Sequence, residues 1–232
     1  MIVSIHQPDY IPYLGYFYKI YQSDIFVFLD DCQFSSDNWH HWNRIKTSQG
    51  ECRLKIPTTY KLGDKIKDVQ TKDYLKWKEK HLKTIEMNYK KTKYFNEIFP
   101  MFKELLMAKY DNLADMNIEI NTYFAMRFGM APRFLRTSKM DIKTVRAERV
   151  IDICKKCKGA KYISGLGAKA YQVEGDFIKE GITLQYTDFK SFKYPQAWKD
   201  FVPNLSVLDY IFNCGYDFDK IYSAIKFNKE SV

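Results

Sequence analysis

Residues able to do chemistry follow the first apolar run of the chain, where IVSI leads into HQPDYIPYLGYF. His6 carries an imidazole whose ordinary pKa of about 6.5 suits a general base toward an amine or a hydroxyl. Gln7 offers a donor and an acceptor to a polar substrate, and the two prolines hold the loop rigid. We interpret the stretch as a ligand loop; the alternative is a histidine with a purely structural role. Further substrate-binding candidates here are Tyr10, Tyr16 and Lys19.

Two carboxylates and a thiol follow the next apolar run, in DIFVFLDDCQF. Adjacent side chains of an extended segment point to opposite faces, so one of Asp30 and Asp31 is expected to face a site. That carboxylate would bind a cation, an amine or a ribose hydroxyl, unless the pair forms a turn or a helix cap. Cys32 is a candidate nucleophile if it meets His6. The catalytic candidates are therefore His6, Asp31 and Cys32, with Asp30 and Gln33 as substrate-binding candidates.

A polar and aromatic segment, QFSSDNWHHWNRIKTSQG, is predicted as a long loop or an irregular hairpin. Arg44 offers a planar fork to phosphate or carboxylate, and Asn43 and Lys46 stand beside it as further binding candidates. Trp39 and Trp42 would stack on a base or a sugar, or else clamp the underside of the loop.

A glycine-rich stretch, SGLGAK, follows a predicted strand and precedes a predicted helix. Backbone N–H groups at such a helix start favour an anion. The stretch lacks the spacing and the GK[ST] ending of a Walker loop. It is either a tight strand–helix turn or a phosphate site, whose candidate residues are Ser164, Gly165, Gly167 and Lys169.

The composition and net charge of the chain limit the kinds of ligand and partner to expect. The 232-residue chain carries a net charge of +9, which favours a phosphorylated or otherwise anionic ligand, or else marks a solvated basic surface. No nucleic-acid-binding motif, membrane-spanning run or export signal is present, so we expect a cytoplasmic location. Five cysteines, an odd number, are expected to be reduced. The CKKC at 154–157 lacks a second ligand pair, so we expect helix neighbours and no metal site.

The elements that must position these residues alternate between strands and helices. Strands are predicted at IVSI, FVFL, RLKIPT, RFLRTS, KYISG and ITLQYTDF, and a helical block at about 71–130, its second helix broken near Pro100. In the last helix, Ser206 and Asp209 fit a capping box. We predict one α/β domain over 1–232, with a Rossmann-like, mostly parallel sheet and a helical cap or insertion at about 71–130. Ligands then collect at the carboxyl ends of the strands, where the unusual segments fall.

These segments also resemble a known family. IHQPDYIPYLGYFYKI, DIFVFLDDCQF, NRIKT, KHLKTIEMNYKKTKYF, YISGLGAKAY and FVPNLSVLDYIFNCG resemble, in order, the WbqC-like family of bacterial proteins. The resemblance covers nearly the whole chain. Such proteins are encoded among genes for O-antigen, and hence lipopolysaccharide, and for other surface polysaccharides. The resemblance implies a cytoplasmic protein of modified-sugar or glycan assembly.

A weaker similarity links the first helix to the nucleotidyltransferase and pantothenate synthetase superfamily. Tyr13, Gly15 and Tyr16 occupy the positions of its HxGH signature, which binds nucleotide phosphates, and VFLDDCQF resembles its carboxylate-holding segment. Tyrosines cannot supply imidazolium charge. Adenylylation would therefore need another cation, from among His6, Lys19 and Arg44.

Together these features favour an enzyme over a binding module. The expected reaction transfers an acyl or aminoacyl group to the amine of a nucleotide-linked sugar. His6 would accept the proton, Gln7 and Asp31 would orient the sugar, and Arg44 with the 165–167 loop would hold the phosphates. The donor stays open: a carboxylate activated by ATP in a ligase reaction, or an acyl thioester, with an acyl carrier as partner. The alternative is a non-catalytic carbohydrate- or protein-binding component of a glycan assembly complex, using a surface rich in Trp and Tyr.

Overall fold

A parallel sheet organises the chain. The computed structural model describes residues 1–187, 189–198, 200–219 and 221–223. Within them, five strands hydrogen-bond in the order β7-β2-β1-β8-β9, and every neighbouring pair is parallel. This arrangement confirms the predicted Rossmann-like α/β fold. The strands are β1 (Ile2–His6), β2 (Ile25–Phe28), β7 (Arg133–Arg136), β8 (Lys161–Ser164) and β9 (Thr183–Tyr186).

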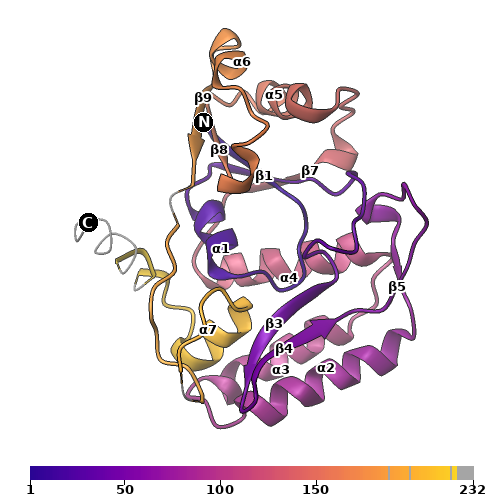
Figure 1. Cartoon of the computed structure of the whole chain (residues 1–232), viewed down its shortest axis with the longest axis vertical. Helices are drawn as coiled ribbons and strands as arrows, with labels where there is room; N and C mark the ends of the chain where they lie inside the picture. Colours follow the sequence, from indigo (N-terminus) through magenta and orange to yellow (C-terminus); the bar gives the residue numbers. More distant parts are fainter. Residues whose placement is uncertain (188, 199, 220, 224–232) are drawn as a thin grey trace.

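Helices cover both faces of this sheet (Figure 1). Side chains alternate along a strand, so each strand feeds two cores. Val3 of β1 packs in the core beneath α5 (Arg146–Lys156) and α6 (Glu174–Lys179). Phe26 of β2 packs in the opposite core, with α1 (Leu14–Tyr21) and α4 (Leu113–Arg127). Because both faces are covered, the carboxyl edge of the sheet is left to bind ligands.

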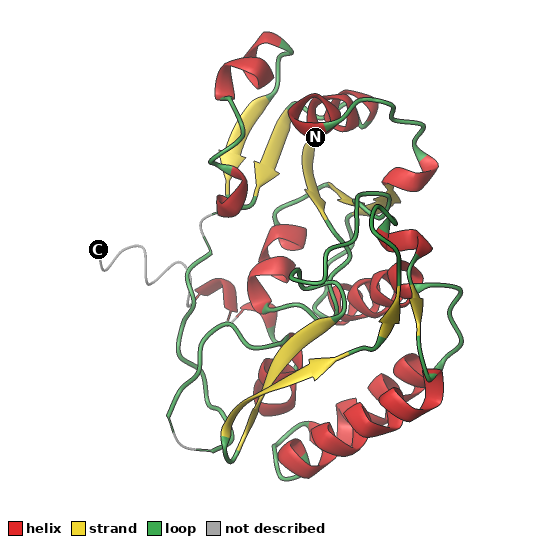
Figure 2. Cartoon of the chain, turned by 45° about the vertical axis from the view of Figure 1, so that its right-hand side comes forward, coloured by secondary structure: helices red, strands yellow, loops and turns green. Residues whose placement is uncertain are grey.

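The helical block predicted for about 71–130 is present as α2 (Tyr74–Tyr89), α3 (Phe95–Met107) and α4. A hairpin of β3 (Trp42–Thr47) and β4 (Gly50–Lys55) and the helix α7 (Val207–Cys214) join this block below the sheet (Figures 1 and 2). Tyr89 links three of these elements, since its hydroxyl donates to Asp209 on α7 and accepts from the backbone N–H of Lys46 on β3. The short pair β5 (Thr58–Thr59) and β6 (Gln70–Thr71) completes the strands.

Three local predictions need correction. The second helix of the block is continuous through Pro100, because the buried stripe of Ile98, Phe102 and Leu106 stabilises it despite one lost backbone hydrogen bond. Asp209 forms no capping box. Ser206 caps the N–H of Leu208, whereas the Asp209 carboxylate accepts hydrogen bonds from two tyrosines.

The third correction concerns the glycine-rich stretch. SGLGAK does not enter an α-helix directly: its central residues form a 3-10 turn at Leu166–Ala168, and α6 begins only at Glu174. The polar segment at 33–50, by contrast, takes the hairpin alternative, with regular antiparallel pairs from Trp42–Lys55 to Thr47–Gly50.

Candidate functional site

A cavity of about 800 Å³ opens at the carboxyl edge of the parallel sheet. Its walls come from the ends of β1, β2 and β8, from α1, and from the start of α5. Several of the residues singled out from the sequence line it together: His6, Gln7, Lys19, Cys32, Ser164, Gly165 and Gly167. The sheet topology thus brings segments from three distant parts of the chain into one site.

His6 is held in one orientation at this site. Its Nδ1 lies 3.1 Å from the carbonyl oxygen of Gln7 and 3.6 Å from Oδ2 of Asp9. A carbonyl oxygen only accepts hydrogen bonds, so Nδ1 carries the proton and Nε2 of the neutral ring keeps its lone pair. The Tyr16 ring packs edge-on against the imidazole at 4.7 Å. The side chain, 34% exposed, therefore presents a defined basic nitrogen.

The protonation state of His6 follows from its surroundings. Burial and the positive charge of Lys19 lower its pKa to about 4, although Asp9 and the hydrogen bond to Gln7 oppose this shift. The imidazole is consequently neutral at pH 7 and able to accept a proton. Burial likewise lowers the pKa of Lys19 to about 7, and its Nζ donates to the carbonyl of Ile5 at 2.8 Å.

The loop that carries His6 is anchored from the helical block. Asn117 on α4 donates to the carbonyls of Pro8 at 2.9 Å and His40 at 2.7 Å, and Asn121 donates to that of Asp9 at 2.9 Å. Asn43 on β3 donates to the carbonyls of Tyr10 and Ile11, both at 3.0 Å. Ile11 has φ 37°, an unusual conformation for a β-branched residue. The surrounding hydrogen bonds fix this strained loop, and they give Asn43 an anchoring position away from the cavity.

Cys32 and Gln7 both line the cavity, and their side chains are in contact. Its Sγ accepts a hydrogen bond from Nε2 of Gln7 at 3.1 Å and donates to the carbonyl of Leu29 at 3.2 Å. Burial raises the pKa of the thiol to about 11. At neutral pH the group is therefore a thiol, which is a poorer nucleophile than a thiolate.

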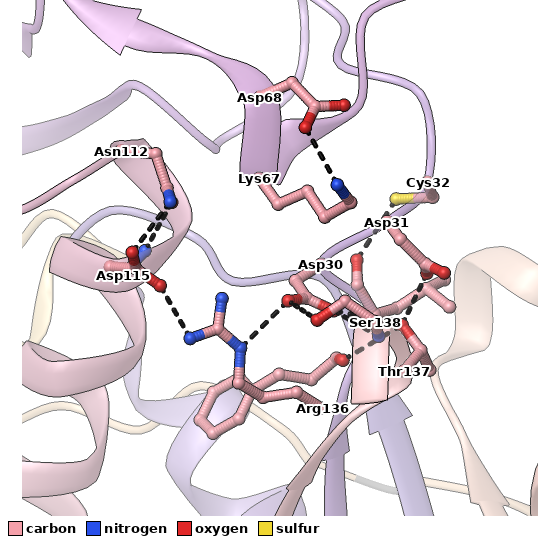
Figure 3. Close-up of polar contacts among 12 residues, drawn as sticks. Asp30, Asp31, Cys32, Lys67, Asp68, Asn112, Asp115, Arg136, Thr137 and Ser138 are labelled. Carbon is pink, nitrogen blue, oxygen red and sulfur yellow. Dashed lines mark hydrogen bonds and ion pairs between the residues drawn. The ribbon is translucent and has the colours of Figure 1, made fainter. Parts of the chain in front are cut away.

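The two aspartates have different partners (Figure 3). Asp30 is fully buried and accepts from Nε of Arg136 at 2.9 Å and from the N–H and hydroxyl of Ser138 at 2.9 and 2.6 Å. Arg136 continues to Asp115 on α4. Asp31 accepts from Thr137 and from Arg149 on α5. Although burial opposes it, these hydrogen bonds lower the pKa of Asp31. Asp30 thus ties β2 to β7 and α4, whereas Asp31 holds a side chain of the cavity.

The remaining candidates do not line the cavity, and each contacts another residue. The Tyr10 hydroxyl is hydrogen-bonded to Nδ1 of His81 at 3.0 Å, and Gln33 forms a backbone bridge with Lys65. On the hairpin, Arg44 pairs with Glu51 at 2.7 Å, and Lys46 donates to Gln196 and to the carbonyl of Asp200. Lys169 places its Nζ 5.9 Å from the ring of Tyr186. The structure therefore does not bring Arg44 together with the glycine-rich loop.

Sequence reasoning missed three residues of this region: Asp9, Arg146 and Arg149. The signals were the spacing of Asp9 three residues after His6, and the two arginines of RAER, which stand one turn apart at the start of a predicted helix. The two cysteines of CKKC pack in the core at the end of α5. No cluster of histidine, cysteine or acidic side chains in the described ranges is arranged to hold a metal ion.

The fold and this cavity define a Rossmann-like α/β protein with a candidate ligand site at the carboxyl edge of its sheet. The chain belongs to the WbqC-like protein family, whose model matches residues 7–220. It is similar to the uncharacterized protein Rv1507c of Mycobacterium tuberculosis (strain ATCC 25618 / H37Rv), at 30% identity over 217 residues, which cover 92% of this chain and 94% of the relative. No solved structure matches. None of the helices in the described residues has the length and apolar character needed to cross a membrane.

Proposed function

We propose that the protein is an enzyme of bacterial surface-polysaccharide biosynthesis that transfers an acyl or aminoacyl group to the amine of a nucleotide-linked sugar. One observation carries the proposal: the neutral imidazole of His6 lines the cavity, and its Nδ1–H donates to the carbonyl of Gln7 with the Asp9 carboxylate 3.6 Å away. Membership of the WbqC-like family supports the polysaccharide context. The cavity of about 800 Å³ is large enough for a sugar nucleotide.

In the proposed reaction the sugar amine attacks the carbonyl carbon of the donor, and a C–N bond forms. The amine proton passes to Nε2 of His6, and the bond from the carbonyl carbon to the leaving group breaks. The leaving group is AMP if ATP activates the carboxylate, or a thiol if the donor is an acyl thioester. Gln7, which lines the cavity beside His6, would orient the sugar.

The test is a mass-spectrometric assay of the full chain with nucleotide-linked amino sugars and three donor sets: amino acids with ATP, acyl-coenzyme A, and acyl carrier protein. A product heavier than the sugar nucleotide by the acyl mass, formed by the wild type and not by His6→Ala, supports the proposal. Ligands that co-purify with the protein, identified in the same instrument, guide the choice of sugar. No acylated product with any of these sets would refute it.

A second candidate function is binding without catalysis, and the hairpin favours it. Trp39 and Trp42 lie with ring centroids 4.0 Å apart, and Arg53 lies 3.4 Å over the Trp42 ring. Exposed aromatic and guanidinium groups suit contact with sugars. A thermal-shift screen separates the two candidates, because a ligand that binds the native state raises the melting temperature. Stabilisation by plain glycans, with none by sugar nucleotides or acyl carriers, would favour the binding module.

A further inference from the structure

The walls of the cavity carry an excess of positive charge. Arg146 and Arg149 line it, together with Lys19, which carries part of its charge at pH 7 because burial lowers its pKa to about 7, and none of the described lining residues is an aspartate or a glutamate. Two carboxylates lie near these cations: Asp31 binds Arg149, and Asp9 raises the pKa of Lys19 by its negative charge. A cavity with cationic walls attracts and concentrates anionic ligands.

Arg149 lines the cavity, and one hydrogen-bond donor of its guanidinium has no partner in the described residues. Its Nη2 donates to Asp31, but its Nε is buried and has no hydrogen-bond partner in the described part of the chain. A buried donor without a partner is costly, and a charged one more so. An acceptor from a bound ligand would satisfy it. Asp31 meanwhile fixes the position of the guanidinium, so little freedom is lost when such a ligand binds.

The helix that carries Arg149 begins at the same wall. Val145, Arg146 and Ala147 line the cavity at the start of α5, which runs for 11 residues. Val145 at the N-cap has no side chain able to accept from the first N–H groups of the helix. Uncapped N–H groups at a helix N-terminus favour phosphate oxygens, and here they act together with the arginines one turn apart.

We propose that this wall is a diphosphate-binding subsite, formed by Arg149, Arg146, Lys19 and the N-terminus of α5. It rests on the proposed function in that the diphosphate belongs to the sugar nucleotide. His6 lines the same cavity. A sugar attached to a diphosphate at this wall would therefore lie in the cavity that contains the proposed general base, His6. This assignment replaces Arg44, which is not part of the cavity lining, whereas Ser164, Gly165 and Gly167 of the glycine-rich loop line the same cavity.

The test is isothermal titration calorimetry of the full chain with inorganic pyrophosphate, uridine diphosphate and uridine. We expect both phosphate compounds to bind, uridine to bind at least tenfold more weakly than uridine diphosphate, and the affinity to fall as salt rises. Arg149→Met should weaken pyrophosphate binding by about 10–100-fold, since charge-assisted hydrogen bonds to phosphate are lost. Arg149→Lys keeps a charge beside Asp31 but removes the Nε donor, and should also weaken binding. Arg127→Met, near the end of α4 and outside the cavity lining, is the matched control and should bind as the wild type does.

Pyrophosphate affinity unchanged in both Arg149 variants, or lowered equally in Arg127→Met, would overturn the subsite. Melting curves show whether each variant is folded, and Arg149→Lys keeps the test valid if Arg149→Met does not fold. The proposed function fails separately. Phosphate binding that depends on Arg149, without acyl transfer, retains the subsite and rejects the reaction. Acyl transfer with Arg149-independent phosphate binding does the reverse.

Discussion

Oδ2 of Asp9 lies 3.6 Å from Nδ1 of His6, and Oδ1 of the same carboxylate accepts a hydrogen bond from Nδ1 of His40 at 3.0 Å. One buried carboxylate therefore lies between two imidazoles. His40 is fully buried and fixes the carboxylate from the side of the helical block. Asp9 in turn orients the His6 ring, and its negative charge opposes the lowering of the His6 pKa by burial.

The first prediction concerns the base itself. His6→Ala should lower the turnover of acyl transfer by about 10²–10⁴-fold, the usual effect of losing a general base. The fold should persist, because the side chain is partly exposed and faces a cavity; circular dichroism checks this. Cys32→Ser is the comparison. Full activity in His6→Ala, with activity lost in Cys32→Ser, would assign the chemistry to the thiol instead.

Asp9→Asn tests the orienting carboxylate. Removing its charge takes away a contribution that raises the pKa of His6, so the pKa should move below about 4. A less basic imidazole is a weaker proton acceptor, so kcat should fall while the acid limb of the pH–rate profile moves to lower pH. NMR titration of the His6 ring measures the pKa directly. A fall in kcat with an unmoved pKa would mean that Asp9 acts only by supporting the loop.

The strands β1 and β2 could be predicted because each is a short, strongly apolar run that leads to polar residues. The alternation of Val3 and Ile5 with residues of the other face leaves little choice of register. The shared edge of the sheet then placed His6, Cys32 and Ser164 together. These inferences need only local pattern and the rule that parallel strands end at one edge.

Arg149 could not be placed in this way, because its position depends on how α5 packs over the sheet, which its own sequence does not specify. The phosphate-binding role predicted for the hairpin residues was wrong for a related reason. Arg44 and Lys46 have the chemistry of phosphate ligands, but the hairpin pairs them with Glu51 and with the 196–200 segment. The sequence shows the chemical type of each side chain, but it does not show which distant residue that side chain will contact.

Asp30 should matter for stability rather than for substrate binding. Asp30→Ala removes the acceptor for Arg136 and Ser138 and leaves partly buried donors unpaired, so the free energy of unfolding should fall by about 1–3 kcal/mol. Asp68→Ala is the matched control, because its pair with Lys67 is exposed and should contribute less than about 1 kcal/mol. Denaturant unfolding measures both. Equal losses in the two variants would refute the structural role of Asp30.

Gly159 should not tolerate a side chain. A Cβ at this position would lie 2.5 Å from Cγ2 of Val3, where β1 approaches the end of α5. Gly159→Ala should therefore lower the free energy of unfolding by about 1–3 kcal/mol through overpacking. Gly175 has open space around it and lies in α6, so Gly175→Ala should be neutral or stabilising by up to about 1 kcal/mol. A stabilising Gly159→Ala, measured by denaturant unfolding, would contradict this close packing.

Stability should also fall as the pH drops from about 6.5 toward 4, and His81 offers a clean test. Burial lowers its pKa from 6.5 to about 4, and its Nδ1 is hydrogen-bonded to the Tyr10 hydroxyl. Between these two values the unfolded chain binds a proton that the folded chain excludes, so the free energy of unfolding decreases as pH falls. For one such histidine the loss between pH 7 and 5 is on the order of 1–2 kcal/mol.

His81→Gln keeps a hydrogen-bonding group near Tyr10 without a titrating ring, so urea unfolding at pH 7, 6 and 5 should show a shallower decline than in the wild type. His6 and His41, whose pKa values are also lowered to about 4, remain in the variant and account for the decline that persists. Identical pH dependence in the two proteins would show that His81 takes up its proton without cost to the fold.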